Sequence, residues 1–189
     1  MSDKELLDRI RNKDKGAFKH LVDNYNSLVL NICNSFLHNF EDSQDVSQEV
    51  FIEVYKSIDK FRGESKISTW LYRISVNKSL NHIRKNKRNA IFRSFETIIK
   101  SQKKETENLA ESNESENDFE NDKRSRVLYE ALDSLPQNQK IAFNLSKLNN
   151  MKYKEISEVM NVSVSSVESL IFRAKKNLQK KLINIYKEN

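Results

Sequence analysis

The chain has 189 residues, of which 37% are hydrophobic and 32% charged, so any apolar core must be modest and is expected to be divided. Two glycines and one proline are too few for the tight turns of a β-sandwich, and the composition favours helices. A single cysteine and three histidines without neighbours at ligand spacing exclude a disulfide framework and predict no metal and no cofactor. The net charge of +6 is compatible with a polyanionic partner and equally with lysine-rich helix surfaces.

The N-terminal segment MSDKELLDRIRNKDK is charged throughout and lacks the apolar core of a signal peptide. No window of the sequence approaches the roughly 20 apolar residues that a membrane-spanning helix needs. We therefore expect a cytoplasmic protein that does not insert into a membrane, with its one cysteine, Cys33, as a small core residue.

Apolar residues recur at helical spacing over residues 4–40. Leu7 and Ile10 share one side of a short first helix. Asp14 is a suitable N-cap for a longer second helix, whose apolar face continues to Phe36.

A third helix is expected to open at Asp42 or Ser43 and to bury a row of valines. Its opposite side carries polar side chains that form either a solvated face or a docking surface for a basic partner helix. This acidic face consists of Asp45, Gln48, Glu49 and Glu53. After a break at 61–63, a fourth helix is expected from about Ser68 to Arg88.

The composition changes abruptly after this first domain, residues 1–90. Residues 84–104 hold eight Lys or Arg and a single acid, whereas residues 105–122 hold eight acids and no Lys or Arg. Apolar residues are sparse in the acidic stretch, so burial cannot offset the entropy of ordering it. We therefore predict a flexible acidic linker over residues 91–122 and a second domain over residues 123–189.

Residues 152–175 have the layout of a helix-turn-helix. A short helix is followed by the turn Asn161-Val162-Ser163, where asparagine tolerates left-handed backbone geometry. The next helix begins with small polar residues, which suit the close approach of a recognition helix to base edges in the major groove. Residues 171–187 then hold six Lys or Arg and no acid, a charge that suits the DNA backbone. The alternative is a helical hairpin whose last helix has a solvated basic face.

Aromatic and basic residues surround the glycine-containing break of the first domain. Phe61, Trp70 and Tyr72 are followed along the chain by Arg73, Lys78, Arg84, Lys85, Lys87 and Arg88. Exposed aromatic side chains beside cations suit single-stranded nucleic acid, because an unpaired base stacks while its phosphate is neutralised. From spacing alone, at least one of Trp70 and Tyr72 is expected to pack into the core instead.

Two runs of this sequence resemble the sigma-70 family of RNA polymerase sigma factors, and they are closest to its compact extracytoplasmic-function group. The first run, similar to the second conserved region of the family, is DVSQEVFIEVYKSIDKFRGESKISTWLYRISVNKSLNHIRK, residues 45–85. The second, similar to the fourth region, is LDSLPQNQKIAFNLSKLNNMKYKEISEVMNVSVSSVESLIFRAKKNL, residues 132–178. The resemblance implies an all-α protein of two small helical domains joined by a flexible acidic linker.

The resemblance also implies roles for residues at matching positions. Asp45, Gln48 and Glu49 match a D-x-x-Q-E pattern that grips the clamp helices of the largest polymerase subunit, and Glu53 extends that face. The residues implied in capturing and melting the −10 element are Phe61, Gly63, Glu64, Ser65, Lys66, Ser68, Trp70, Tyr72, Arg73, Asn77, Lys78 and Arg84. The residues implied in reading the −35 element are Tyr153, Ser165, Ser166, Glu168, Ser169, Phe172, Arg173, Lys175 and Lys176. Promoter opening by binding energy follows, without ATP and without a catalytic residue.

The second run departs from the common pattern of the family at two positions. Position 168 is often basic and position 170 often arginine, whereas this chain has Glu168 and Leu170. Phosphates repel a glutamate in the groove, and such a glutamate accepts best from a cytosine amino group. We therefore expect a changed −35 preference, with backbone affinity that depends on Arg173, Lys175 and Lys176.

The leading interpretation is a monomeric sigma factor that binds core RNA polymerase and promoter DNA, and the resemblance implies an anti-sigma protein as a further partner. An ordinary regulator with a C-terminal helix-turn-helix would instead bind duplex DNA as a dimer without polymerase. An enzyme is disfavoured, because the sequence shows no paired carboxylates with a metal-binding histidine, no nucleophile with a base and no glycine-rich phosphate loop.

Overall fold

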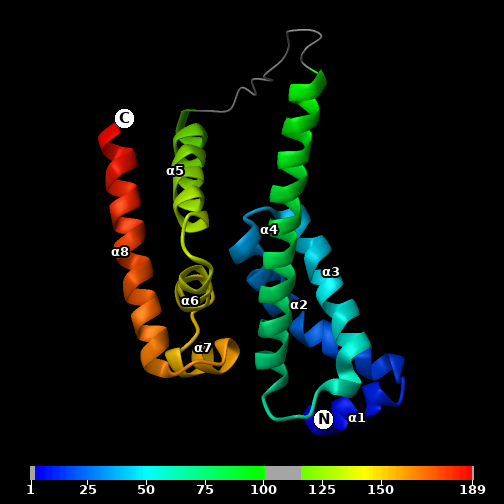
Figure 1. The fold of residues 1–189 in the computed structure, drawn as a ribbon. Coiled ribbons are helices and arrows are strands. Elements are labelled where there is room, and N and C mark those ends of the chain that lie inside the picture. Colours follow the sequence, from blue (N-terminus) through cyan, green and yellow to red (C-terminus); the bar gives the residue numbers. More distant parts are fainter. Residues whose placement is uncertain (1–2, 101–115, 189) are drawn as a thin grey trace.

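The computed structural model describes the backbone of residues 3–100 and 116–188, and side chains within residues 3–90 and 125–185. The described chain is helical and contains no strand, as the sequence predicts (Figure 1). The middle of the predicted linker lies outside these ranges. None of the described helices combines the length and the apolar character needed to cross a membrane.

The N-terminal unit consists of α1 (Asp3–Arg11), α2 (Lys15–Leu37), α3 (Phe40–Ser57), the 3-10 turn η1 (Ile58–Lys60) and α4 (Ile67–Lys100). The predicted cap of α2 is confirmed: the Asp14 carboxylate accepts hydrogen bonds from the backbone N–H groups of Gly16 and Ala17, at 2.8 and 3.1 Å. These bonds, with the neighbouring Arg9, hold the pKa of Asp14 below its ordinary value.

Two predicted helix boundaries in this unit were wrong. Helix α3 begins at Phe40 rather than at Asp42 or Ser43, because Asn39 is its N-cap and accepts from the Asp42 N–H at 2.9 Å. Helix α4 continues past Arg88 to Lys100, through a stretch that contains neither glycine nor proline to end it.

The C-terminal unit consists of α5 (Glu116–Asp133), α6 (Gln137–Lys147), α7 (Tyr153–Met160) and α8 (Val164–Glu188). Between α7 and α8, Asn161 has a φ of 54°, which confirms the left-handed turn expected there. The Ser163 hydroxyl accepts from the Ser166 N–H at 3.1 Å and caps the first turn of α8.

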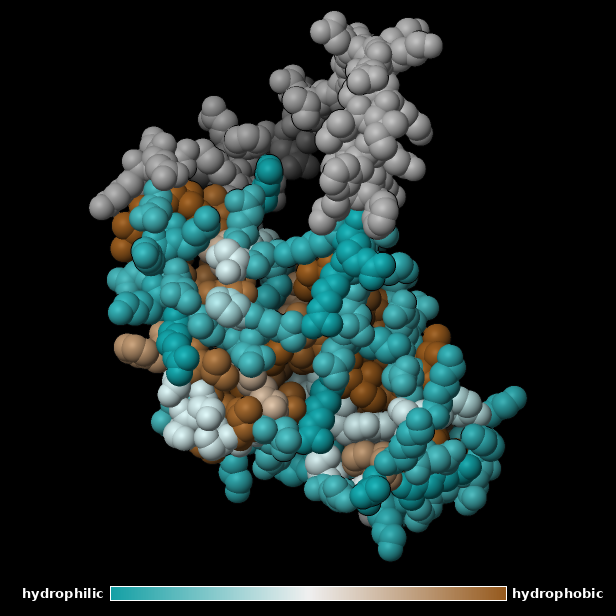
Figure 2. All heavy atoms as spheres, viewed as in Figure 1, coloured by the Kyte–Doolittle hydropathy of each residue, from teal (hydrophilic) through white to brown (hydrophobic). Residues whose placement is uncertain are grey.

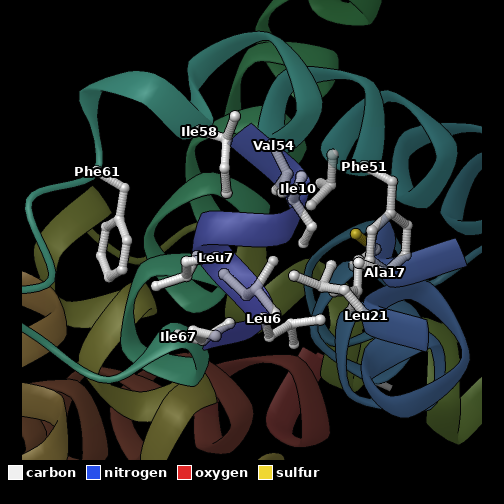
Figure 3. Close-up of a cluster of buried hydrophobic side chains, with 14 of the residues drawn as sticks. Leu6, Leu7, Ile10, Ala17, Leu21, Phe51, Val54, Ile58, Phe61 and Ile67 are labelled. Atoms are coloured by element: carbon white, nitrogen blue, oxygen red, sulfur yellow. The ribbon is translucent and has the colours of Figure 1, made fainter. Parts of the chain in front are cut away.

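Each unit has an apolar cluster of its own. In the N-terminal unit, side chains from α1 to α4 form one buried cluster, part of which Figure 3 shows around Leu7. Val50 and Cys33 are buried in the same cluster, so the cysteine is a core residue as predicted. Burial raises the pKa of the Cys33 thiol to about 11. In the C-terminal unit, Leu132 and Leu178 lie in a smaller cluster between α5 and α8.

A third apolar cluster is shared by the two units. Residues of α2 and α4 are buried together with residues of α6, α7 and α8. The members of this shared cluster are Ile32, Phe36, Val76, Leu80, Ile141, Ala142, Leu145, Ile156, Val159, Val167 and Ile171. In Figure 2, apolar side chains show through a mostly hydrophilic face in its central part, where the units meet. Their packing follows from the apolar side chains that each unit leaves facing the other.

Polar contacts flank the shared cluster. The buried Asn144 side chain of α6 donates to the Ser35 carbonyl of α2 at 2.6 Å, and Asn149 donates to the Ser35 hydroxyl at 3.0 Å. At the end of α2, the His38 ring stacks on the Tyr129 ring of α5, with centroids 4.0 Å apart. These contacts add direction to apolar packing that is itself non-directional.

Replacing Asn144 with alanine should weaken the packing of the two units. The Ser35 carbonyl would then lose its buried donor, a change that costs about 1–3 kcal/mol. We expect a larger radius of gyration for Asn144→Ala by small-angle X-ray scattering. Asn177→Ala is the matched control, because the exposed Asn177 donates to Gln139 within the C-terminal unit. Equal radii for the two variants would contradict the role of Asn144.

Acidification should also loosen the contact at His38. Burial and the nearby Lys140 charge lower the pKa of His38 from 6.5, with Asp133 opposing them. A lowered pKa in the packed state means that packing is fully favourable above pH 6.5 and weakens as the pH falls through the lowered pKa. Scattering recorded down through this range should show expansion of the native chain. His38→Phe retains a ring against Tyr129 and should remove this part of the pH dependence.

Candidate polymerase and promoter interface

The predicted acidic face lies on the outer side of α3. Asp45, Gln48 and Glu49 are exposed. Glu53 is only partly exposed, and its carboxylate pairs with the Lys78 ammonium of α4 at 3.2 Å. Ile52 follows Glu49 by three positions and is 53% exposed, and it was not predicted as part of this face. The face therefore combines two free carboxylates and an amide with an apolar side chain.

An exposed loop, residues 62–66, connects η1 to α4. Its ends are fixed, since Phe61 before it and Ile67 after it are both buried. Gly63 has a φ of 74°, a left-handed conformation that favours glycine. The side chains of Glu64 and Lys66 are exposed, as expected for a loop that meets a ligand.

The aromatic residues near this loop are only partly accessible. Phe61 is buried and stacks on Trp70, with ring centroids 4.6 Å apart. Tyr72 is half-buried against the shared cluster, and this burial, with the charge of Glu155, raises its pKa. The expectation that at least one of Trp70 and Tyr72 packs into the core is confirmed, because each packs against a different cluster.

Three predicted DNA-binding cations of α4 have partners within the protein. The Arg73 guanidinium donates to the carbonyl oxygens of Glu158 and Val159 at the end of α7, at 2.6 and 3.3 Å. Arg84 donates to the Gln137 side chain of α6 at 2.7 Å, and Lys78 pairs with Glu53. By contrast, Asn77 of the same helix is exposed.

The helix-turn-helix consists of α7 and the first turns of α8. Ser165, Ser166, Glu168 and Ser169 are exposed, and Phe172 is 69% exposed. The basic residues that follow, also exposed, are Arg173, Lys175 and Lys176. Tyr153 at the start of α7 differs from them, since it is half-buried against the shared cluster. This helix pair, with one exposed polar end and a basic continuation, is the layout of a DNA-binding domain.

Family models match both units. The model of sigma-70 region 2 matches residues 21–89, and the model of sigma-70 region 4 matches residues 125–178. The extracytoplasmic-function sigma-E factor of Haemophilus influenzae is 32% identical over 96% of this chain and 96% of its own length. The sigma-E factor of Escherichia coli K12 is 31% identical over 96% of this chain and 95% of its own length. The chain belongs to the sigma-70 family, in its extracytoplasmic-function group.

Solved structures show the same fold for nearly the whole chain. CnrH, solved in complex with the cytosolic domain of CnrY, superposes with a TM-score of 0.65 at 21% identity, over 96% of this chain and 97% of that chain. The sigma factor RpoE of Bartonella quintana, solved with the anti-sigma factor NepR, gives a TM-score of 0.56 at 18% identity. That match covers 87% of this chain and 96% of RpoE.

Proposed function

We propose that this sigma factor binds core RNA polymerase through the acidic face of α3, opens the −10 element with the N-terminal unit and reads the −35 element with α7 and α8. The observation that carries the proposal is that one chain presents two different exposed elements, the loop 62–66 and the first turns of α8. A duplex-binding regulator needs only the second of them. The protein acts by binding alone and works where the polymerase is, in the cytoplasm.

The loop 62–66 is suited to capture a base flipped from the non-template strand. Flipping costs a few kcal/mol of unstacking and unpairing. A loop with buried ends and a left-handed glycine is already ordered, so little further ordering entropy opposes binding of the base. This supports promoter opening by binding energy, without ATP.

The start of α8 is suited to the major groove, because its exposed serines are short and Phe172 projects from the same helix. Arg173, Lys175 and Lys176 follow on the next turn and would contact the DNA backbone. Both elements are thus accessible in the packed arrangement, whereas the neighbouring Tyr72 and Arg73 lie against the C-terminal unit.

Contact of Tyr72 and Arg73 with promoter DNA therefore requires the two units to separate. We propose that core polymerase favours the separated form by binding each unit at a different place. An anti-sigma protein would favour the packed form, and the structural neighbours CnrH and RpoE support such a partner because RpoE was solved with its anti-sigma factor NepR and CnrH with CnrY. The free chain is expected to be a monomer.

The proposal is tested by reconstituting the full chain with core polymerase from the same organism and transcribing genomic DNA. We expect transcripts that start at a restricted set of promoters, and mapping of their ends would give the −10 and −35 sequences. Polymerase that gains no new start sites would contradict the proposal, and binding of duplex DNA by a dimer without polymerase would favour a regulator.

The acidic face should be needed for core binding. We expect the double substitution Asp45→Ala and Glu49→Ala to weaken core binding at least about tenfold, because charged hydrogen bonds contribute roughly 1.5–3 kcal/mol each. Glu41→Ala with Asp59→Ala is the matched control, since both of these acids are exposed outside the face. Affinity measured by fluorescence anisotropy should fall only for the first pair.

Glu168 should determine part of the −35 preference. Glu168→Ala removes repulsion from phosphates and an acceptor for a cytosine amino group, so we expect tighter but less selective binding, with about 1–3 kcal/mol of base discrimination lost at one position. The loss of discrimination is measured by selecting −35 sequences with the reconstituted holoenzyme and comparing the preferences of the native and variant proteins. Glu130→Ala, at an exposed acid of α5, is the control, and an unchanged preference in Glu168→Ala would place Glu168 outside the groove.

A further inference from the structure

The short helix α1 supports both ends of the loop 62–66. Leu7 is buried, and it lies between Phe61 and Ile67, the residues that flank the loop (Figure 3). Any displacement of α1 would therefore change the path of the loop, although α1 lies more than 50 positions away in the sequence.

A polar contact from the end of α1 holds the first peptide of the loop. The Arg11 guanidinium donates through Nη2 to the Phe61 carbonyl at 2.5 Å, and through Nη1 to the Asp8 carboxylate at 2.9 Å. The Phe61 N–H donates in turn to the Ile58 carbonyl at 3.2 Å. Both backbone polar groups of Phe61 are thus bonded, and Arg62 begins the loop immediately afterwards.

An arginine suits this double contact better than a lysine. A planar guanidinium bonds two acceptors at once in a fixed geometry, whereas a lysine ammonium is a flexible point charge. The neighbouring Arg9 has a different role: it pairs with Asp14 at 2.8 Å, in the turn before α2. The two arginines of α1 therefore provide a matched pair, of which Arg11 bonds the segment that leads into the loop.

We propose that Arg11 is a positioning residue for base capture: its bond to the Phe61 carbonyl fixes the start of the loop 62–66 in the conformation that receives the flipped base. This inference rests on the proposed function of the loop. Without the bond, the loop would sample more conformations, and binding the base would carry the entropy of ordering it. Arg11 itself need not touch DNA.

The test compares two non-template-strand oligonucleotides that carry a −10 sequence found by start-site mapping, one intact and one abasic at the captured base. The full chain is used, assembled with core polymerase. For the native protein we expect tighter binding of the intact strand. For Arg11→Ala we expect this preference to fall by about five- to thirtyfold, the change that ordering one residue implies. Binding of the abasic strand and of core polymerase should not change.

Arg9→Ala should retain the native preference, and Arg11→Lys, which keeps a donor for the Phe61 carbonyl, should restore part of it. Equal weakening on both strands would mean that Arg11 acts through charge or general stability, which overturns the proposal, as does an unchanged preference in Arg11→Ala. If the native protein does not distinguish the strands, base capture itself fails and the proposal fails with it. Should Arg11→Ala unfold, the same comparison with Arg11→Lys decides.

Discussion

The apolar packing between α2, α4 and the helix-turn-helix determines which surfaces of the molecule are accessible to partners. Side chains such as Val76 of α4 and Ile156 of α7 are buried in one cluster that belongs to both units. Fully burying an aliphatic side chain of this size contributes about 1.5–3 kcal/mol, so a cluster of several holds the units together without any one decisive contact. The surfaces beside this cluster are covered as a consequence, and the surfaces far from it stay accessible.

Under the proposed function, the same packing links polymerase binding to DNA access. A partner shifts the balance between packed and separated units only by the difference in its affinity for the two forms. Under the proposed function, promoter DNA gains contacts when Tyr72 and Arg73 are uncovered, whereas a protein that bridges both units gains contacts when they stay packed. A single interface of moderate strength between the units is therefore enough for one partner to favour the packed form and another to favour the separated form.

Features that depend on local sequence were predictable. Asp14 and Asn161 were identified because an N-cap and a left-handed turn follow from the residues next to them. The apolar periodicity likewise gave the helices and placed Cys33 in the core. The start of α3 was misplaced because the sequence Asn39 to Ser43 offers several capping side chains, and only the geometry selects Asn39.

Features that depend on partners distant in sequence were not predictable. Asn144 contacts Ser35 across 109 positions, and Arg11 contacts Phe61 across 50. In the sequence, each is an unremarkable polar residue on a helix, and periodicity says nothing about which carbonyl lies opposite. The shared cluster was missed for a related reason. The apolar face of a short helix such as α7 can be buried equally well against its own unit or against the other one, and the sequence does not distinguish the two.

Contacts between residues distant in sequence also decide which cations are available to DNA. The sequence suggests that cations of α4 and α8 serve DNA alike, yet in the packed form Arg73 caps the carbonyl end of α7 and Lys78 pairs with Glu53. An arginine at a helix C-terminus also offsets the partial negative charge there, so releasing Arg73 uncovers a cation and removes its bonds to the carbonyl end of α7. Lys175 and Lys176 are already exposed in the packed form, so their availability does not depend on separation of the units. Under the proposed function, duplex binding by the C-terminal unit does not require separation of the units, whereas melting by the N-terminal unit does.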